Sequence, residues 1–122
     1  MYYVYMVRCG DDSLYTGIAA DVCRRMREHT EKRAVAAKYT RSRSVTALEG
    51  LWRTEDRSSA SRLEYAVKHL SREKKLLLLA QPQRLTELLP QLAQETYTHI
   101  AGVTLEMCLE GGWNDEAICS AP

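Results

Sequence analysis

Residues 2–29 read YYVYMVRCGDDSLYTGIAADVCRRMREH, and their pattern predicts a strand, a tight turn, a second strand and a helix. The β-prone run over residues 2–8 ends at the turn-forming Gly-Asp-Asp-Ser, and a shorter run follows over residues 14–19, which is typical of a β-hairpin. Asp21 stands where a helix N-cap belongs, directly before a helical pattern over residues 22–30. The stretch therefore predicts a hairpin and a helix at the start of a mixed fold.

The predicted helix carries an arginine and a histidine on the side that should face the sheet. At about 100° per residue, four residues share one arc about 100° wide: Val22, Arg25, Met26 and His29. Charged residues cover the opposite side, namely Arg24, Arg27, Glu28 and Glu31. By itself the pattern fits a snorkelling arginine and a satisfied histidine at the core edge about as well as it fits a functional site.

Two tyrosine motifs followed by this helix resemble the GIY-YIG nuclease superfamily, including its small stand-alone bacterial members. That family has a short motif ending in Tyr, a Tyr-x-Gly motif about ten residues later, and a helix with an Arg and a His about one turn apart. The corresponding residues here are Val4-Tyr5, Tyr15-Thr16-Gly17, Arg25 and His29. Tyr3-Val4-Tyr5 replaces Gly-Ile-Tyr, a departure that the small members often show. The resemblance covers residues 2–81.

The resemblance implies a small α+β domain with a three-stranded antiparallel sheet flanked by helices. The strands are expected over residues 2–8, 14–19 and 44–53. Gly50, inside the third strand, indicates a bulge or a break. Residues 1–81 are expected to form the GIY-YIG-like nuclease domain, and residues 82–122 an acidic C-terminal extension that packs on this domain or is loosely attached to it.

The resemblance also implies an active site. Its catalytic residues correspond to Tyr5, Tyr15, Arg25, His29 and Glu64. Gly17 would let the backbone approach closely where a Cβ would intrude. The family holds its metal with a glutamate on a later helix, so Glu64 is the implied ligand of one divalent ion, Mg²⁺ or Mn²⁺.

The helix that carries this glutamate is predicted over residues 59–70, because Ser58 and Ser59 are good helix-starting residues. Its apolar arc also includes the carboxylate, and consists of Ala60, Leu63, Glu64 and Val67. A purely structural alternative is a capping box formed by Ser61 and Glu64, in a helix that starts later. A further helix should follow Ser71 and stop at Pro82.

Basic residues gather after the first helix. Residues 24–43 hold eight Lys and Arg against two acids, with Tyr39 between Lys38 and Arg41. Such a mixture suits phosphate contact and base stacking, although a solvated loop explains it too. The expected nucleic-acid contacts are Arg24, Arg27, Lys38, Tyr39, Arg41, Arg43 and Lys68.

Charge divides the chain into two parts although the net charge is only +1. Residues 1–84 hold all 17 Lys and Arg against 10 acids, whereas residues 85–122 hold six acids and no Lys or Arg. This asymmetry indicates a nucleic-acid surface joined to an acidic segment. The four cysteines form no C-x-x-C pair, so reduced thiols in a cytoplasmic protein are expected. We expect no membrane association, because no apolar run approaches about 20 residues.

The C-terminal third contains no recognised motif. Residues 85–92 have helical leucine spacing, and residues 97–109 alternate in places, which predicts a strand. The acidic segment is also a candidate for folding back on the basic face and competing with nucleic acid. Deletion of residues 95–122 should then tighten DNA binding.

These features favour an Mg²⁺-dependent endonuclease that hydrolyses DNA, including branched or damaged structures. One hard cation on a single carboxylate keeps several waters and binds phosphate oxygens directly. Arg25 would bind phosphate, and Tyr5 or Tyr15 would accept a proton from water. The alternatives are a non-catalytic nucleic-acid-binding module, a nuclease subunit that depends on a protein partner or a homodimer, and a protein-interaction domain that docks through its acidic segment.

Overall fold

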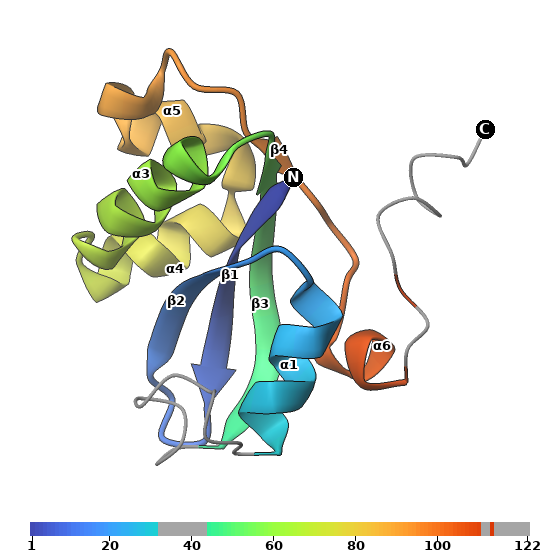
Figure 1. Cartoon of the computed structure of the whole chain (residues 1–122). Helices are drawn as coiled ribbons and strands as arrows, with labels where there is room; N and C mark the ends of the chain where they lie inside the picture. The colour runs from blue at the N-terminus through green and yellow to red at the C-terminus, as the bar shows by residue number, and fades with distance from the viewer. Residues whose placement is uncertain (32–43, 111–112, 114–122) are drawn as a thin grey trace.

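The computed structural model describes residues 1–31, 44–110 and 113, and shows a four-stranded antiparallel sheet between two helical layers (Figure 1). The strands are β1 (Tyr2–Cys9), β2 (Leu14–Ala19), β3 (Val45–Thr54) and β4 (Thr98–His99), in the order β2-β1-β3-β4. The helices are α1 (Val22–Thr30), α3 (Arg57–Lys68), α4 (Arg72–Ala80), α5 (Leu85–Leu88) and α6 (Leu105–Leu109), with single 3₁₀ turns at η1 (Pro82–Arg84) and η2 (Pro90–Leu92). The predicted α+β class is confirmed. The predicted count of three strands is wrong, because the short β4 pairs with β3.

Alternation along β1 assigns the two faces of the sheet. Tyr3, Tyr5 and Val7 point into one hydrophobic cluster with α1 and α6, whereas Val4 and Met6 point into a second cluster with α3, α4 and α5. Figure 1 shows α1 and α6 on one side of the sheet and α3, α4 and α5 on the other. β1 is central and buried on both faces, and β2 forms an edge that both helical layers approach.

The first helix begins where the sequence predicts. The Asp21 side chain accepts a hydrogen bond from the backbone N–H of Arg24 at 3.0 Å, which satisfies one of the free donors of the first turn. The hairpin before it is also confirmed, with β1 and β2 paired from Tyr3↔Ala19 to Arg8↔Leu14.

β3 carries two irregularities, one of them at the predicted glycine. Met6 pairs with Gly50 but Val7 pairs with Leu48, so Glu49 is an extra residue in the ladder. The bulge explains why Leu48 and Leu51, three residues apart, belong to the same cluster. A Cβ at Gly50 would lie only 2.7 Å from Leu79 Cδ2. The absence of a side chain at Gly50 therefore lets β3 pack closely against α4.

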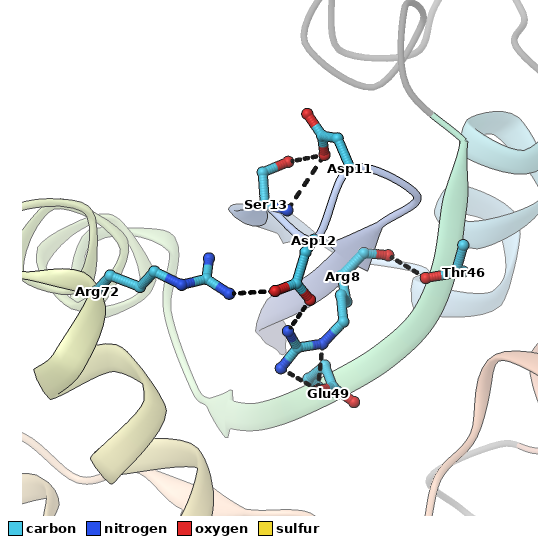
Figure 2. Close-up of polar contacts among 7 residues, drawn as sticks. All are labelled: Arg8, Asp11, Asp12, Ser13, Thr46, Glu49 and Arg72. Atoms are coloured by element: carbon cyan, nitrogen blue, oxygen red, sulfur yellow. Dashed lines mark hydrogen bonds and ion pairs between the residues drawn. The ribbon is translucent and has the colours of Figure 1, made fainter.

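A polar cluster fixes the hairpin turn to β3 and α4 (Figure 2). Arg8 Nε donates to Glu49 Oε2 at 2.9 Å, and Arg72 donates to Asp12 Oδ2 at 3.0 Å. Arg8 also pairs with Asp12, which adopts a left-handed conformation with φ 68° at the turn. The Thr46 hydroxyl donates to the Arg8 carbonyl at 3.1 Å. The turn therefore has a defined position at the end of the sheet.

The start of α3 differs from its predicted start. Asp56 is the N-cap and accepts from the backbone N–H of Ser59 at 2.7 Å, so the helix begins before Ser58. Glu64 then lies in the middle of α3, which rules out its capping box with Ser61. The helix expected after Ser71 is confirmed as α4, and the Ser71 side chain caps it by accepting from the backbone N–H of Lys74.

The described residues after residue 81 pack on both faces of the sheet. Leu85, Leu89 and Leu92 join the cluster under α3, whereas Ile100 and Leu105 join the cluster under α1. The predicted strand over residues 97–109 is wrong: only β4 pairs with the sheet, and α6 forms from residue 105, capped by Thr104. Deletion of residues 95–122 would remove buried core and is no clean test of competition with nucleic acid. In the described ranges no helix has the length and apolar character needed to cross a membrane.

Candidate active site

A pocket of about 440 Å³ lies at the β2 edge of the sheet. The following residues line it: Tyr2, Tyr5, Tyr15, Gly17, Ile18, Ala19, Ala20, Arg25, Arg57 and Glu64. They come from β1, β2, α1, α3 and the loop after β2. Because β2 is an edge strand, side chains from the two helical layers meet around it, so one pocket combines Arg25 from one layer with Glu64 from the other.

Tyr5 and His29 form a buried pair at the back of this pocket. The Tyr5 hydroxyl lies 2.9 Å from His29 Nε2, and neither side chain is exposed. Tyr15 completes an aromatic group, with its ring centroid 6.4 Å from Tyr5 and 5.9 Å from His29. The helical spacing that put His29 on the sheet side of α1 is thus confirmed, and its partner is a motif tyrosine.

Arg25 reaches from α1 to the edge of the pocket. Its Nη1 donates to the Ile18 carbonyl at 3.3 Å, and its Nε donates to Glu28 at 3.2 Å. Glu28 is only 9% exposed, so its predicted place on the solvent side is wrong. Two arginines, Arg25 and Arg24, pair with its carboxylate, and this pairing makes the buried position tolerable.

Glu64 approaches the same pocket from α3. Its carboxylate pairs with Lys68 Nζ at 3.3 Å, one turn further along the helix. Lys68 Nζ in turn lies 5.7 Å from the ring centroid of Tyr15, within the range of a cation–π contact. The Glu64 side chain is partly exposed, and its carboxylate already lies beside the Lys68 ammonium group.

Burial sets the protonation of the aromatic group. It raises the pKa of the Tyr5 hydroxyl above its usual value, with a further rise from Tyr15 and an opposing effect of the Arg25 guanidinium. Burial also raises the pKa of Tyr15, against the effect of Lys68. Burial and the nearby Arg25 lower the pKa of His29 to about 4, so its imidazole is neutral at pH 7. A neutral imidazole can accept a proton, whereas both phenols keep theirs.

The expected nucleic-acid contacts have different surroundings. Arg24 is exposed and pairs with Glu28, and Lys68 pairs with Glu64. Arg27 instead donates to the Cys108 carbonyl at 3.4 Å and helps to hold α6. The other four, Lys38, Tyr39, Arg41 and Arg43, lie outside the described residues.

Five residues that line the pocket were not expected from the sequence, and two of them, Tyr2 and Arg57, have polar side chains. The other three are Ile18, Ala19 and Ala20. The signal for Arg57 was its helical spacing: it precedes Glu64 by seven residues, about two turns, and so lies on the same face of α3. The predicted start of the helix after Ser58 concealed this relation.

A divalent ion suits the donors of this pocket. Among the described residues no three His, Cys, Asp or Glu side chains lie close enough to enclose a metal. One carboxylate in an open, partly polar pocket is nevertheless what Mg²⁺ or Mn²⁺ needs when water and substrate phosphate supply most ligands. Glu64 is the residue that would hold such an ion, and three tyrosines line the same pocket.

Substitution of Gly17 tests how tightly this site is packed. A Cβ on Gly17 would lie 2.6 Å from Tyr5 Cζ, so Gly17→Ala should displace the Tyr5 ring from His29. We expect a loss of about 1–3 kcal/mol in the free energy of unfolding, measured by urea titration. Gly10→Ala is the matched control, because its Cβ would meet nothing nearer than 3.8 Å. Equal stability of the two variants would contradict the packing described here.

Comparison with known proteins identifies the family of this chain. Residues 1–76 match the family described as the GIY-YIG catalytic domain. The UPF0213 protein BH0048 of Halalkalibacterium halodurans is 44% identical over 79 residues, which cover 65% of this chain and 82% of that protein. The UPF0213 protein YhbQ of Salmonella arizonae is 36% identical over 91 residues, 75% of this chain and 89% of the relative.

One solved structure is also similar. The solution NMR structure of the UPF0213 protein BH0048 from Bacillus halodurans is 39% identical and aligns with 79% of this chain and 100% of its own, with a TM-score of 0.43. The names of these relatives state no reaction or substrate. The match over residues 1–76 shows that the chain belongs to the GIY-YIG catalytic domain family, a family of nucleases.

Proposed function

We propose that this protein is an endonuclease that hydrolyses DNA phosphodiester bonds with the help of one divalent metal ion. The observation that carries the proposal is the meeting of Arg25, Glu64 and the Tyr5–His29 pair around one pocket. Phosphodiester hydrolysis needs a group for the negative phosphate, an acceptor for the proton of water, and stabilisation of the charge that develops. These residues supply all three.

Arg25 is the phosphate-binding group. A guanidinium remains charged at every working pH and donates two parallel hydrogen bonds to one phosphate. Its present acceptors, the Ile18 carbonyl and Glu28, leave it at the edge of the pocket, partly exposed. A phosphate in the pocket therefore has a donor beside it that requires no change of protonation.

The Tyr5–His29 pair is the proton acceptor in this mechanism. A phenolate at Tyr5 is unfavourable, because burial raises the pKa of the hydroxyl. The neutral His29 nitrogen 2.9 Å away can accept the Tyr5 proton as the phenol accepts one from the attacking water. The phenol then stays neutral throughout, and Tyr15 packs against both rings to hold them in place.

Glu64 would anchor the metal ion. When bound, a divalent ion supplies positive charge at the phosphate oxygens and the leaving oxygen. The Glu64 carboxylate has one partner in the described chain, Lys68, in a partly exposed pair. Partly exposed ion pairs contribute little to stability, so replacing Lys68 by a metal ion at the Glu64 carboxylate would cost little free energy.

A second function is favoured by the same ion pair. Because Lys68 already offsets the Glu64 charge, a phosphate could bind in the pocket without a metal. The protein would then be a non-catalytic DNA-binding module, or a nuclease subunit that needs a partner or a second copy for turnover.

Plasmid nicking separates the two functions. Supercoiled plasmid is incubated with the full chain in Mg²⁺, in Mn²⁺ and in EDTA, and the open-circular product is measured. Metal-dependent nicking supports the endonuclease, and DNA binding without nicking of plasmid, splayed-arm or abasic DNA favours the binding module. Nicking that is unaffected by EDTA would contradict the metal-dependent mechanism.

A further inference from the structure

The charged face of α3 extends beyond the glutamate. Arg57, Glu64 and Lys68 fall within about 40° of one another around the helix, at about 100° per residue. At about 1.5 Å per residue, Arg57 lies about 10 Å before Glu64 along the axis, and Lys68 about 6 Å after it. The stripe thus has a carboxylate between two cations. Arg57 and Glu64 line the same pocket.

The helix itself does not account for Arg57. It is the first residue of α3, where the positive end of the helix dipole disfavours a cation. The carboxylate of the preceding N-cap, Asp56, accepts from the backbone N–H of Ser59, and the first turn itself contains no acid. Lys68, at the last residue, is in a favourable place by the same rule. Arg57 is exposed, and within the described part of the chain it has no hydrogen bond or ion pair.

Two other arginines on α3 and α4 have structural partners. Arg72 is also the first residue of its helix, but it donates to Asp12 at 3.0 Å at the hairpin turn (Figure 2). Arg62, further along α3, pairs with Glu95. Arg72 and Arg62 therefore have structural roles, whereas Arg57 lines the open pocket.

We propose that Arg57 is a substrate-positioning residue that binds a backbone phosphate of the same DNA strand, next to the one that is cleaved. This inference rests on the proposed function of the pocket. It implies that the strand runs along the stripe of α3, with the scissile phosphate at Glu64 and Arg25. Arg57 then holds the strand on one side of that phosphate, and Lys68 holds it on the other.

The test uses the full chain and a fluorescein-labelled splayed-arm DNA in EDTA, with affinity measured by fluorescence anisotropy at several salt concentrations. Arg57→Gln should weaken binding about tenfold and reduce the slope of log affinity against log salt by about one. Arg57→Lys should retain most of the affinity, since a phosphate accepts a point charge. Arg72→Gln, which removes the same charge from the same helix position, should leave affinity and slope near those of the parent.

Melting temperature provides the structural readout. Arg57→Gln should melt at or slightly above the parent temperature, because it removes a cation from a helix N-terminus. If Arg57→Gln bound DNA as tightly as the unsubstituted chain, or if Arg72→Gln weakened DNA binding as much as Arg57→Gln, the role of Arg57 would be overturned. The nuclease proposal would remain intact. A parent chain that binds no DNA would overturn both.

Neutral phosphates test the direction of the strand. Single methylphosphonate groups are placed on either side of the branch point of the same DNA. In the parent, a methylphosphonate at a contacted phosphate should weaken DNA binding. In Arg57→Gln and in Lys68→Gln, one such position each should no longer affect the affinity. These two positions should lie on opposite sides of the scissile phosphate. If the same methylphosphonate position loses its effect on affinity in both variants, the proposed path along α3 is wrong.

Discussion

Glu64→Gln is expected to reduce metal-dependent DNA cleavage at least about 10³-fold. The substitution keeps the size of the side chain but removes the carboxylate charge in a pocket that has no second acid among its lining residues. In the proposed mechanism, an ion held by this carboxylate would supply several kcal/mol of transition-state stabilisation, and about 4 kcal/mol corresponds to a factor of about 10³. Single-turnover nicking rates in Mg²⁺ measure this effect without a contribution from product release.

The matched control for this variant is Glu49→Gln. The two glutamates have similar exposure, 25% for Glu64 and 29% for Glu49, and each pairs with one basic side chain, Lys68 or Arg8. Glu49 lies in β3, where it pairs with Arg8 (Figure 2), and it does not line the pocket that contains Glu64. Both substitutions should lower the free energy of unfolding by less than about 1 kcal/mol. If Glu64→Gln cleaved DNA at the rate of the unsubstituted chain, the proposed role of Glu64 in holding a metal would be wrong.

The local parts of the site could be predicted from the sequence, because they depend on short-range rules. The Asp21 cap, the hairpin over residues 2–19 and the place of His29 on the sheet side of α1 follow from capping, turn chemistry and helical periodicity. The resemblance to a nuclease family then associated Glu64 with them. That association concerns side chains on opposite helical layers, which no periodicity can bring together.

The features that the sequence missed depend on contacts between distant segments. The strand expected over residues 97–109 became mostly loop and α6, because the sheet offers it only a short stretch of β3 and the remaining apolar residues pack over α1. Glu28 is buried through its pairs with two arginines and not through its position on the helix arc. Arg57 lies at the pocket because α3 begins directly after the Asp56 cap, earlier than the sequence predicts. Each case is a tertiary effect on a pattern that was locally ambiguous.

Tyr5→Phe is expected to lower the cleavage rate by about 10² to 10⁴, the usual contribution of an acid–base group. The phenyl ring keeps the packing over Gly17 and the contact with Tyr15, but the hydrogen bond to His29 Nε2 is lost. Water then has no route for its proton to the buried imidazole. His29→Gln should show a loss of the same order, and the double variant should be little worse than either single one, because the two residues act as a unit.

The pH dependence of cleavage gives a second readout for the pair. The reactive form of His29 is neutral, and its pKa is lowered to about 4, so kcat/KM should stay level from pH 8 down to about pH 5 and fall below that. An ordinary histidine would lose activity already near pH 6.5. Tyr97→Phe is the control phenol: its hydroxyl donates to the Ser59 carbonyl at 2.7 Å outside the pocket, so its loss should affect stability by about 1 kcal/mol and leave cleavage unchanged. If Tyr5→Phe retained the parental rate and pH profile, the proton would have to leave by another route. Two other phenols line the pocket, Tyr2 and Tyr15, and the Tyr15 ring centroid lies 6.4 Å from that of Tyr5.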